Sequence, residues 1–161
     1  MAVGRESAAD YEHAVEKILS AIFYPALTDP ELQTRVHEGR KIVDITYSNI
    51  ARDGFFFWLR SHYKAPFIFV ECKNYKSDPK NPELDQLSGR FSPNRGQFGL
   101  IVCREIEDKD LFLKRCRDTA NDHRGYIIAL DDNDIVSMAL SREQHGIRFD
   151  QLKNQFQSLV M

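Results

Sequence analysis

The segment FIFVECKNYK, residues 67–76, decides the fold that we expect for this chain. It opens with four apolar residues, which is typical of a strand buried on both faces of a sheet. Glu71 and Lys73 follow where the pattern calls for further apolar residues. Because alternate residues of a strand point to the same side, Glu71 and Lys73 continue the face that carries Phe69. A buried charge is costly unless it is paired or bound to a metal, so this strand indicates a functional site.

A second carboxylate lies inside the preceding apolar run, Ile42-Val43-Asp44-Ile45. If this strand pairs with residues 67–73, Asp44 approaches Glu71, and two carboxylates and the Lys73 ammonium meet. Mg²⁺ binds one or two carboxylates together with water and phosphate, and Mn²⁺ accepts similar ligands. A lysine beside such a site orients a water molecule or neutralises charge on a phosphate. The pattern therefore predicts a divalent-cation site that acts on phosphate.

Working outward from this strand, the remaining sequence alternates between helical and strand-like segments. We expect helices at 8–24, 53–64, 84–91, 108–124, 132–142 and 146–160, and strands at 33–38, 40–48, 67–73, 98–104 and 126–130. The apolar run at 55–59 leaves a strand open as the alternative for 53–64, and Gly125 is expected to follow the C-terminus of the fourth helix. Apolar strands separated by helices predict an α/β protein, a three-layer sandwich around a mixed sheet. We expect one domain over 1–161, with its core at about 8–130 and C-terminal helices at 132–160.

Composition limits the class of protein. The 161 residues are 42% hydrophobic and have a net charge of −2, which excludes a disordered chain and a uniformly basic nucleic-acid binder but not a local basic patch. No apolar run is long enough to cross a bilayer, and the first residues lack the apolar region of a signal peptide. We therefore expect no membrane association. Three cysteines, an odd and sparse set, predict a reducing, cytoplasmic setting.

Asp44 together with Glu71-Cys72-Lys73 resembles the motif of the PD-(D/E)XK nuclease superfamily, in particular the Mrr-type and related restriction nucleases. The resemblance covers about residues 8–130 and implies a restriction-endonuclease-like fold. It also implies a Mg²⁺-dependent endonuclease that hydrolyses DNA, in a restriction or phage-defence setting. The family pattern assigns metal binding to Asp44, Glu71 and the backbone carbonyl of Cys72, and water activation to Lys73. Val43 stands where the family name has proline, which is not a catalytic position.

The same resemblance suggests further site residues. A glutamate of the first helix often joins the metal shell, and Glu12, which lies closer to the apolar face than Glu16, is the expected one. Gln86 matches a polar position on the helix after the motif. Lys76, Arg90 and Arg95 follow the motif strand and are expected to contact DNA phosphates.

Less specific interpretations stay open beside these expectations. Glu71 and Lys73 could form a buried ion pair that only holds strands together, in a catalytically silent module for nucleic-acid binding or complex assembly. The E-x-K pattern is itself common, and Glu107-Asp108-Lys109 matches it in a polar segment. The aromatic residues 55–58 are expected in the core, with base stacking as the alternative. The apolar stripe of residues 149–159 is expected to dock on the core, with a dimer seam or the cut end of a longer protein as the alternatives. DNA and a homodimer or larger defence complex are the expected partners.

Overall fold

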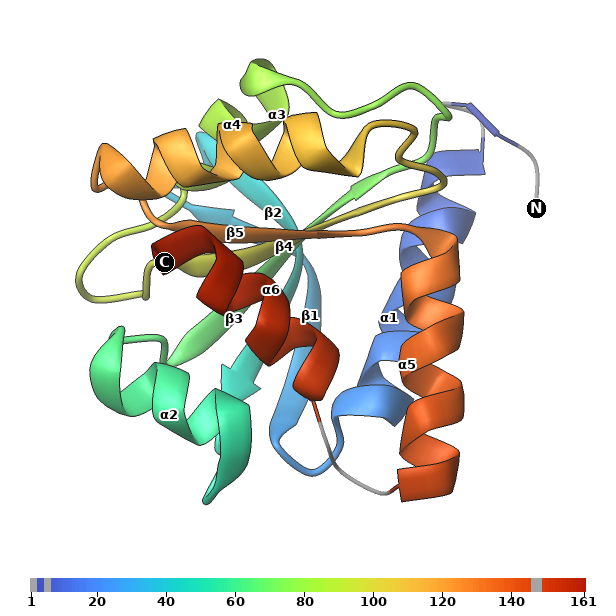
Figure 1. The fold of residues 1–161 in the computed structure, drawn as a ribbon. Coiled ribbons are helices and arrows are strands. Elements are labelled where there is room, and N and C mark those ends of the chain that lie inside the picture. Colours follow the sequence, from blue (N-terminus) through green and yellow to red (C-terminus); the bar gives the residue numbers. More distant parts are fainter. Residues whose placement is uncertain (1–2, 5–6, 146–148) are drawn as a thin grey trace.

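The structure is a computed structural model that describes the chain except residues 1–2, 5–6 and 146–148. Its centre is one five-stranded sheet in the order β1-β2-β3-β4-β5 (Figure 1). Strand β2 runs antiparallel to both of its neighbours, β1 and β3, and β3, β4 and β5 are parallel. The predicted mixed α/β sheet is therefore confirmed. The strands are β1 (Leu27–Val36), β2 (Lys41–Asn49), β3 (Phe67–Lys73), β4 (Phe98–Cys103) and β5 (Tyr126–Leu130).

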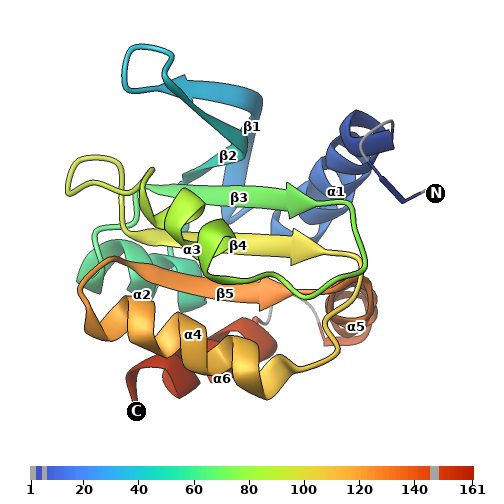
Figure 2. The same ribbon diagram turned by 90° about the horizontal axis from the view of Figure 1, so that it is seen from above.

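Helices cover both faces of this sheet. Helices α3 and α4 lie on one side, and the other four lie on the opposite side (Figures 1 and 2). This arrangement is compatible with the expected three-layer sandwich. The helices are α1 (Ala8–Phe23), α2 (Gly54–His62), α3 (Asn81–Ser88), α4 (Lys109–Asn121), α5 (Asp132–His145) and α6 (Asp150–Val160). None of the helices in the described part of the chain has both the length and the apolar character needed to span a bilayer.

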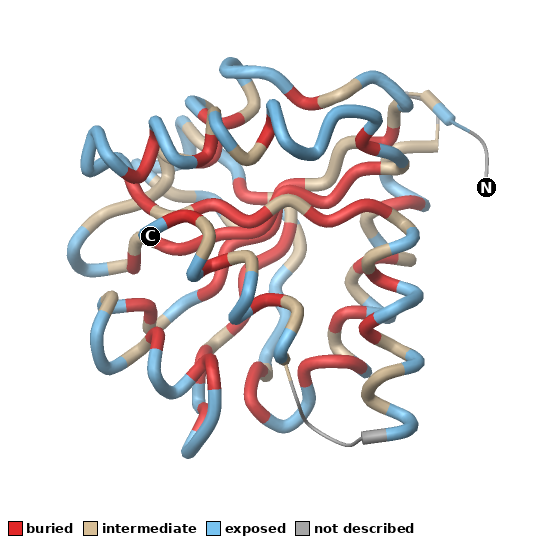
Figure 3. The backbone as a smooth tube through the Cα atoms, in the orientation of Figure 1, coloured by how far each residue is buried: buried red, intermediate tan, exposed pale blue. Residues whose placement is uncertain are grey.

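The core follows the central strands, which are buried along most of their length (Figure 3). All six residues of β4 are buried, as expected for a strand with neighbours on both edges and helices on both faces. On the side of α2 and α6, aromatic rings pack against one another. The ring centroid of Phe156 lies 6.0 Å from that of Phe55 and 6.1 Å from that of Phe98. The stripe of α6, which includes buried Leu152 and Leu159, therefore docks on the core as predicted.

The predicted helix 53–64 is present as α2, Gly54–His62, so the strand alternative for this segment is wrong. The expectation that all four aromatic residues 55–58 are core residues is only half correct. Phe55 and Phe56 are buried, whereas Phe57 and Trp58 keep 40% and 38% of their surface exposed. Successive helical residues are about 100° apart, so four in a row cannot all face one core.

Several element boundaries differ from the sequence prediction. Helix α3 spans Asn81–Ser88 and not 84–91, and α5 continues to His145 and not only to residue 142. Strand β1 begins at Leu27 and not at residue 33, and its register shifts between Thr28 and Glu31, which lets the turn-like Asp29-Pro30 pair sit within the strand. Helix α4 ends at Asn121 and not at residue 124. His123, with φ of 58°, adopts the left-handed conformation after this helix, earlier than the expected Gly125. The predicted start of the last helix, 146–148, lies outside the described residues.

Candidate active site

Strands β2 and β3 bring Asp44 and Glu71 together. Their antiparallel register pairs Ile45 with Val70, so Asp44 and Glu71 occupy the next positions and point to the same face of the sheet. The two carboxyl groups are close enough for the negative charge of Asp44 to raise the pKa of Glu71. Oδ2 of Asp44 also accepts the backbone N–H of Cys72 at 2.8 Å. The sequence prediction that these two carboxylates converge is confirmed in geometry.

Glu71 is fully buried and lies inside a polar network. The Lys73 Nζ lies 3.6 Å from its Oε2, and the Gln86 Nε2 donates to the same oxygen at 3.2 Å. The Gln86 Oε1 in turn accepts from the Lys73 Nζ at 3.1 Å. The amide of Gln86 thus bridges the carboxylate and the ammonium and holds them side by side, which places this predicted residue within the site.

The ionisation of Glu71 reflects these surroundings. Burial, and then the negative charge of Asp44, raise the pKa of Glu71 to about 7, although the charges of Lys73 and Arg90 act in the opposite direction. Near pH 7, Glu71 is therefore only partly ionised. A cation bound beside Glu71 would favour its ionised form.

Arg90 belongs to the same network. Its Nε lies 3.5 Å from Oε1 of Glu71 and donates to the carbonyl of Ile42 at 3.0 Å, and its Nη1 donates to the carbonyl of Gln86 at 2.7 Å. Only 12% of the Arg90 side chain is exposed. The sequence suggested a surface arginine for phosphate contact. The sequence gives no signal for this ion pair, which forms because the chain returns past β2 after α3.

The other two predicted DNA-contacting residues occupy different places. Arg95 lies beside Arg90 and donates to its backbone carbonyl from Nη2 at 3.1 Å. Lys76 is exposed in the loop after β3. Arg95 is therefore joined to the carboxylate network through Arg90, whereas Lys76 is exposed to solvent.

Helix α1 places Glu12 in the electrostatic field of the pair. Glu12 is partly buried, and its carboxylate accepts a hydrogen bond from the Gln33 Nε2 at 2.7 Å. Burial, and then the charge of Asp44, raise the pKa of Glu12. Glu16, the alternative on the same helix, accepts instead from the hydroxyl of Ser20 at 2.7 Å. The Gln33 partner was not foreseen, because this contact depends on how α1 packs against β1 and not on the pattern of either segment.

The donor set fits a hard cation better than zinc. Among the residues that the structure describes, no group of three or more histidine, cysteine or acidic side chains is arranged to hold a metal ion. Mg²⁺ requires fewer protein ligands, since one or two carboxylates suffice. Moreover, Oε1 of Glu71 is buried and accepts no hydrogen bond within the described chain. Asp44 and Glu71 thus provide two neighbouring carboxylates, and the Oε1 of Glu71 faces Arg90 at 3.5 Å without accepting a hydrogen bond from the described residues.

The second E-x-K match has a different environment. Glu107 is exposed in the loop after β4, and Lys109 begins α4 with its Nζ 2.9 Å from both Asp131 and Asp134. The Lys109 ammonium thus already pairs with two carboxylates, which lie at the start of α5. The surroundings, and not the three-residue pattern, distinguish the two matches.

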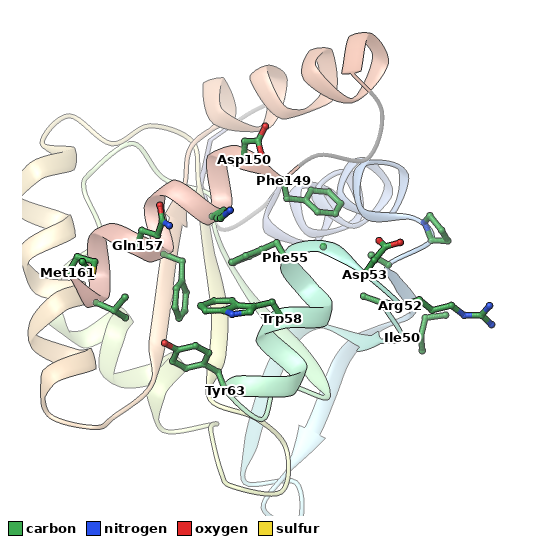
Figure 4. A pocket seen from close by; sticks show the side chains of 17 residues that line it. Ile50, Arg52, Asp53, Phe55, Trp58, Tyr63, Phe149, Asp150, Gln157 and Met161 are labelled. Carbon is green, nitrogen blue, oxygen red and sulfur yellow. The ribbon is translucent and has the colours of Figure 1, made fainter.

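A large cavity of about 1290 Å³ lies elsewhere, between α2, α6 and the segment after β2 (Figure 4). Phe55, Trp58 and Phe156 form its apolar wall. None of the predicted site residues lines it. The candidate active site is therefore the carboxylate cluster at the junction of β2 and β3.

In comparisons with protein family models, curated proteins and solved structures, nothing matches this chain. The functional argument consequently rests on the geometry of the site.

Proposed function

We propose that this protein is a Mg²⁺-dependent endonuclease that hydrolyses DNA phosphodiester bonds, with a restriction-endonuclease-like fold. The observation that carries the proposal is that Asp44 and Glu71 are neighbours across β2 and β3, with the Lys73 Nζ 3.6 Å from Oε2 of Glu71. These residues come from two adjacent strands and meet on one face. The mixed sheet with helices on both sides supports the fold assignment.

In this proposal, Asp44, Glu71 and the backbone carbonyl of Cys72 hold the metal, with Glu12 close to Asp44. When bound, Mg²⁺ supplies a Lewis acid at the scissile phosphate and lowers the pKa of a water molecule. The Cys72 N–H fixes the orientation of the Asp44 carboxylate. Gln86 keeps Lys73 beside Glu71, and the Lys73 ammonium orients the attacking water and stabilises charge on the phosphoryl oxygens.

A catalytically silent module for nucleic-acid binding or assembly is the second candidate. It is favoured by the closed network around Glu71, whose ion pairs with Lys73 and Arg90 could serve only to hold β2, β3 and the segment after α3 together. Cleavage separates the two candidates, because a purely structural network has no need of a divalent cation.

Plasmid nicking with Mg²⁺ or Mn²⁺, with a chelator as control, is the test. We expect Glu71→Gln and Lys73→Met each to lower the cleavage rate by about 100-fold or more, since each removes a group that acts on the reacting atoms. Glu107→Gln, in the other E-x-K match, is the matched control and should cleave normally. Cleavage that survives both site substitutions, or that ignores the chelator, overturns the assignment. DNA binding without cleavage by the wild type favours the silent module.

The biological setting that we propose is restriction or phage defence in the cytoplasm, with DNA as partner and a homodimer or a larger complex as the working form. All three cysteines are free, and Cys103 and Cys116 are buried, which agrees with a reducing compartment. Sedimentation at high concentration tests the dimer, and a monomer under all conditions removes it.

A further inference from the structure

A local concentration of positive charge adjoins the candidate active site. The tip of the β1–β2 hairpin, residues 35–41, and the segment 86–97 after the start of α3 contain only one acidic residue, Glu38, although the whole chain has a net charge of −2. The cations of these two segments are Arg35, Arg40, Lys41, Arg90 and Arg95. The acidic Glu38 pairs with Arg40 at 3.4 Å, but both side chains are largely exposed, so the pair neutralises little.

The two segments pack against each other. The Lys41 Nζ donates to the carbonyl of Gly89 at 2.7 Å, and the Arg95 Nη2 lies 3.0 Å from the His37 Nε2. Slight desolvation of the exposed ring, and then the charges of Arg95, Lys41 and Arg40, lower the pKa of His37. A charged His37 is disfavoured there because positive charge is already concentrated at the hairpin tip.

This basic surface is continuous with the carboxylate pair. From His37 the contacts run to Arg95, from Arg95 to the backbone of Arg90, and from the Arg90 side chain to Glu71. Arg35 also faces the site, because it pairs with Ile42 across the hairpin and so points to the same side of the sheet as Asp44. Positively charged residues thus line the whole path from the hairpin tip to the carboxylates, so that a polyanion bound on the hairpin could extend to them.

The shape of the hairpin favours one polyanion. Strands β1 and β2 project beyond the rest of the sheet as a two-stranded ribbon (Figure 2), and residues 37–40 at the tip are exposed. The major groove of B-form DNA accommodates a two-stranded ribbon, whereas the major groove of an RNA duplex is too narrow for protein side chains to enter.

We propose that the β1–β2 hairpin and the segment 89–95 form a docking surface for duplex DNA, with the hairpin tip in the major groove and the backbone led by Arg95 towards Asp44 and Glu71. This inference rests on the proposed function, whose substrate it places on a defined surface. Arg35, Arg40 and Lys41 supply the cationic contacts at the tip. Because the whole chain has a slightly negative net charge, this local positive charge is the source of the electrostatic affinity for DNA.

The test measures binding of the full chain to a labelled mixed-sequence DNA duplex by fluorescence anisotropy, in chelator to prevent cleavage, across a salt series. For the double variant Arg35→Gln/Arg40→Gln we expect the slope of log affinity against log salt to fall by about 2, one for each lost phosphate contact. The matched control, Lys114→Gln/Lys153→Gln, removes two exposed cations from α4 and α6 and should keep the wild-type slope. Circular dichroism confirms that each variant is folded.

The outcomes separate this inference from the proposed function. A wild-type slope in the hairpin variant, equal losses in the control, or no DNA binding by the wild type overturns the docking surface. Binding an RNA duplex of the same sequence as tightly as DNA overturns the groove docking. Loss of binding in the hairpin variant alone supports the surface even if no divalent cation elicits cleavage, in which case only the nuclease proposal fails.

Discussion

The backbone N–H of Cys72 donates to the Asp44 carboxylate at 2.8 Å, in the position just beyond the last paired residues of β2 and β3. A side-chain oxygen of β2 thus accepts a backbone N–H of β3, whereas regular strand pairing would use a backbone carbonyl as the acceptor. Because Cys72 lies between Glu71 and Lys73, the motif strand itself orients the second carboxylate. This hydrogen bond satisfies the N–H of Cys72, which is a structural role, and orients the carboxylate of Asp44 for the proposed metal site, which is a chemical role.

Substitution of Asp44 separates the two roles. Asp44→Asn keeps an oxygen acceptor for the Cys72 N–H, so we expect a free energy of unfolding close to that of the wild type. Asp44→Ala leaves that N–H without its partner and should cost about 1–3 kcal/mol. Urea denaturation measures the difference, and plasmid nicking should be lost in both variants. Equal stability of the two variants would show that the hydrogen bond contributes nothing.

The buried Glu71 predicts a specific pH dependence of stability. Its folded pKa of about 7 exceeds the ordinary value of 4.5, so the folded protein binds more protons than the unfolded chain between these two pH values. Stability from this group is complete below pH 4.5 and is lost as pH rises through 7, by an amount on the order of 3 kcal/mol. Glu71→Gln imitates the protonated form and should escape the loss.

Denaturation of the wild type and of Glu71→Gln at pH 5 and pH 8 measures this effect. The two proteins should be similarly stable at pH 5, and the variant should be the more stable at pH 8. Because other titrating groups are common to both proteins, their contributions cancel in the comparison. Parallel pH profiles would contradict the raised pKa.

Divalent cations should stabilise the folded protein if Asp44 and Glu71 hold them. At pH 8, Mg²⁺ or Mn²⁺ at 100 times the dissociation constant should add about 2.7 kcal/mol to the free energy of unfolding, and chelator should reverse the gain. Thermal unfolding reports this without any cleavage. Asp44→Asn should lose most of the gain, whereas Glu107→Gln should keep it. A wild type that is indifferent to both cations speaks against the metal site.

Helix α6 should contribute strongly to the core through Phe156. Its ring centroid lies 4.8 Å from that of Tyr63 and 5.4 Å from that of Trp58. Phe156→Ala should therefore cost about 3–5 kcal/mol, with an altered emission of Trp58, the one tryptophan of the chain. Val160→Ala on the exposed side of the same helix should cost under about 0.5 kcal/mol. Similar losses in both variants would contradict the docking of α6.

Local patterns predicted the strands and most helices because each has its own periodicity. The apolar run before Glu71 predicted a buried strand, and the period of two placed Glu71 and Lys73 on one face. The β1 boundary was missed because Asp29-Pro30 is typical of a turn, and only the register shift beside β2 accommodates it. The end of α4 was missed because glycine is the usual residue after a helix, whereas His123 adopts that conformation here.

The sequence by itself determined which strands carry Asp44, Glu71 and Lys73 and the order of the elements, because side-chain alternation and hydrophobic periodicity are local properties. Only the tertiary structure decided that Ile45 pairs with Val70, which aligns the two carboxylates, and that Arg90 returns to Glu71 from the segment after α3. The reason is physical: strand register and ion pairs between distant segments depend on how the whole core packs, and no single stretch of sequence contains that information.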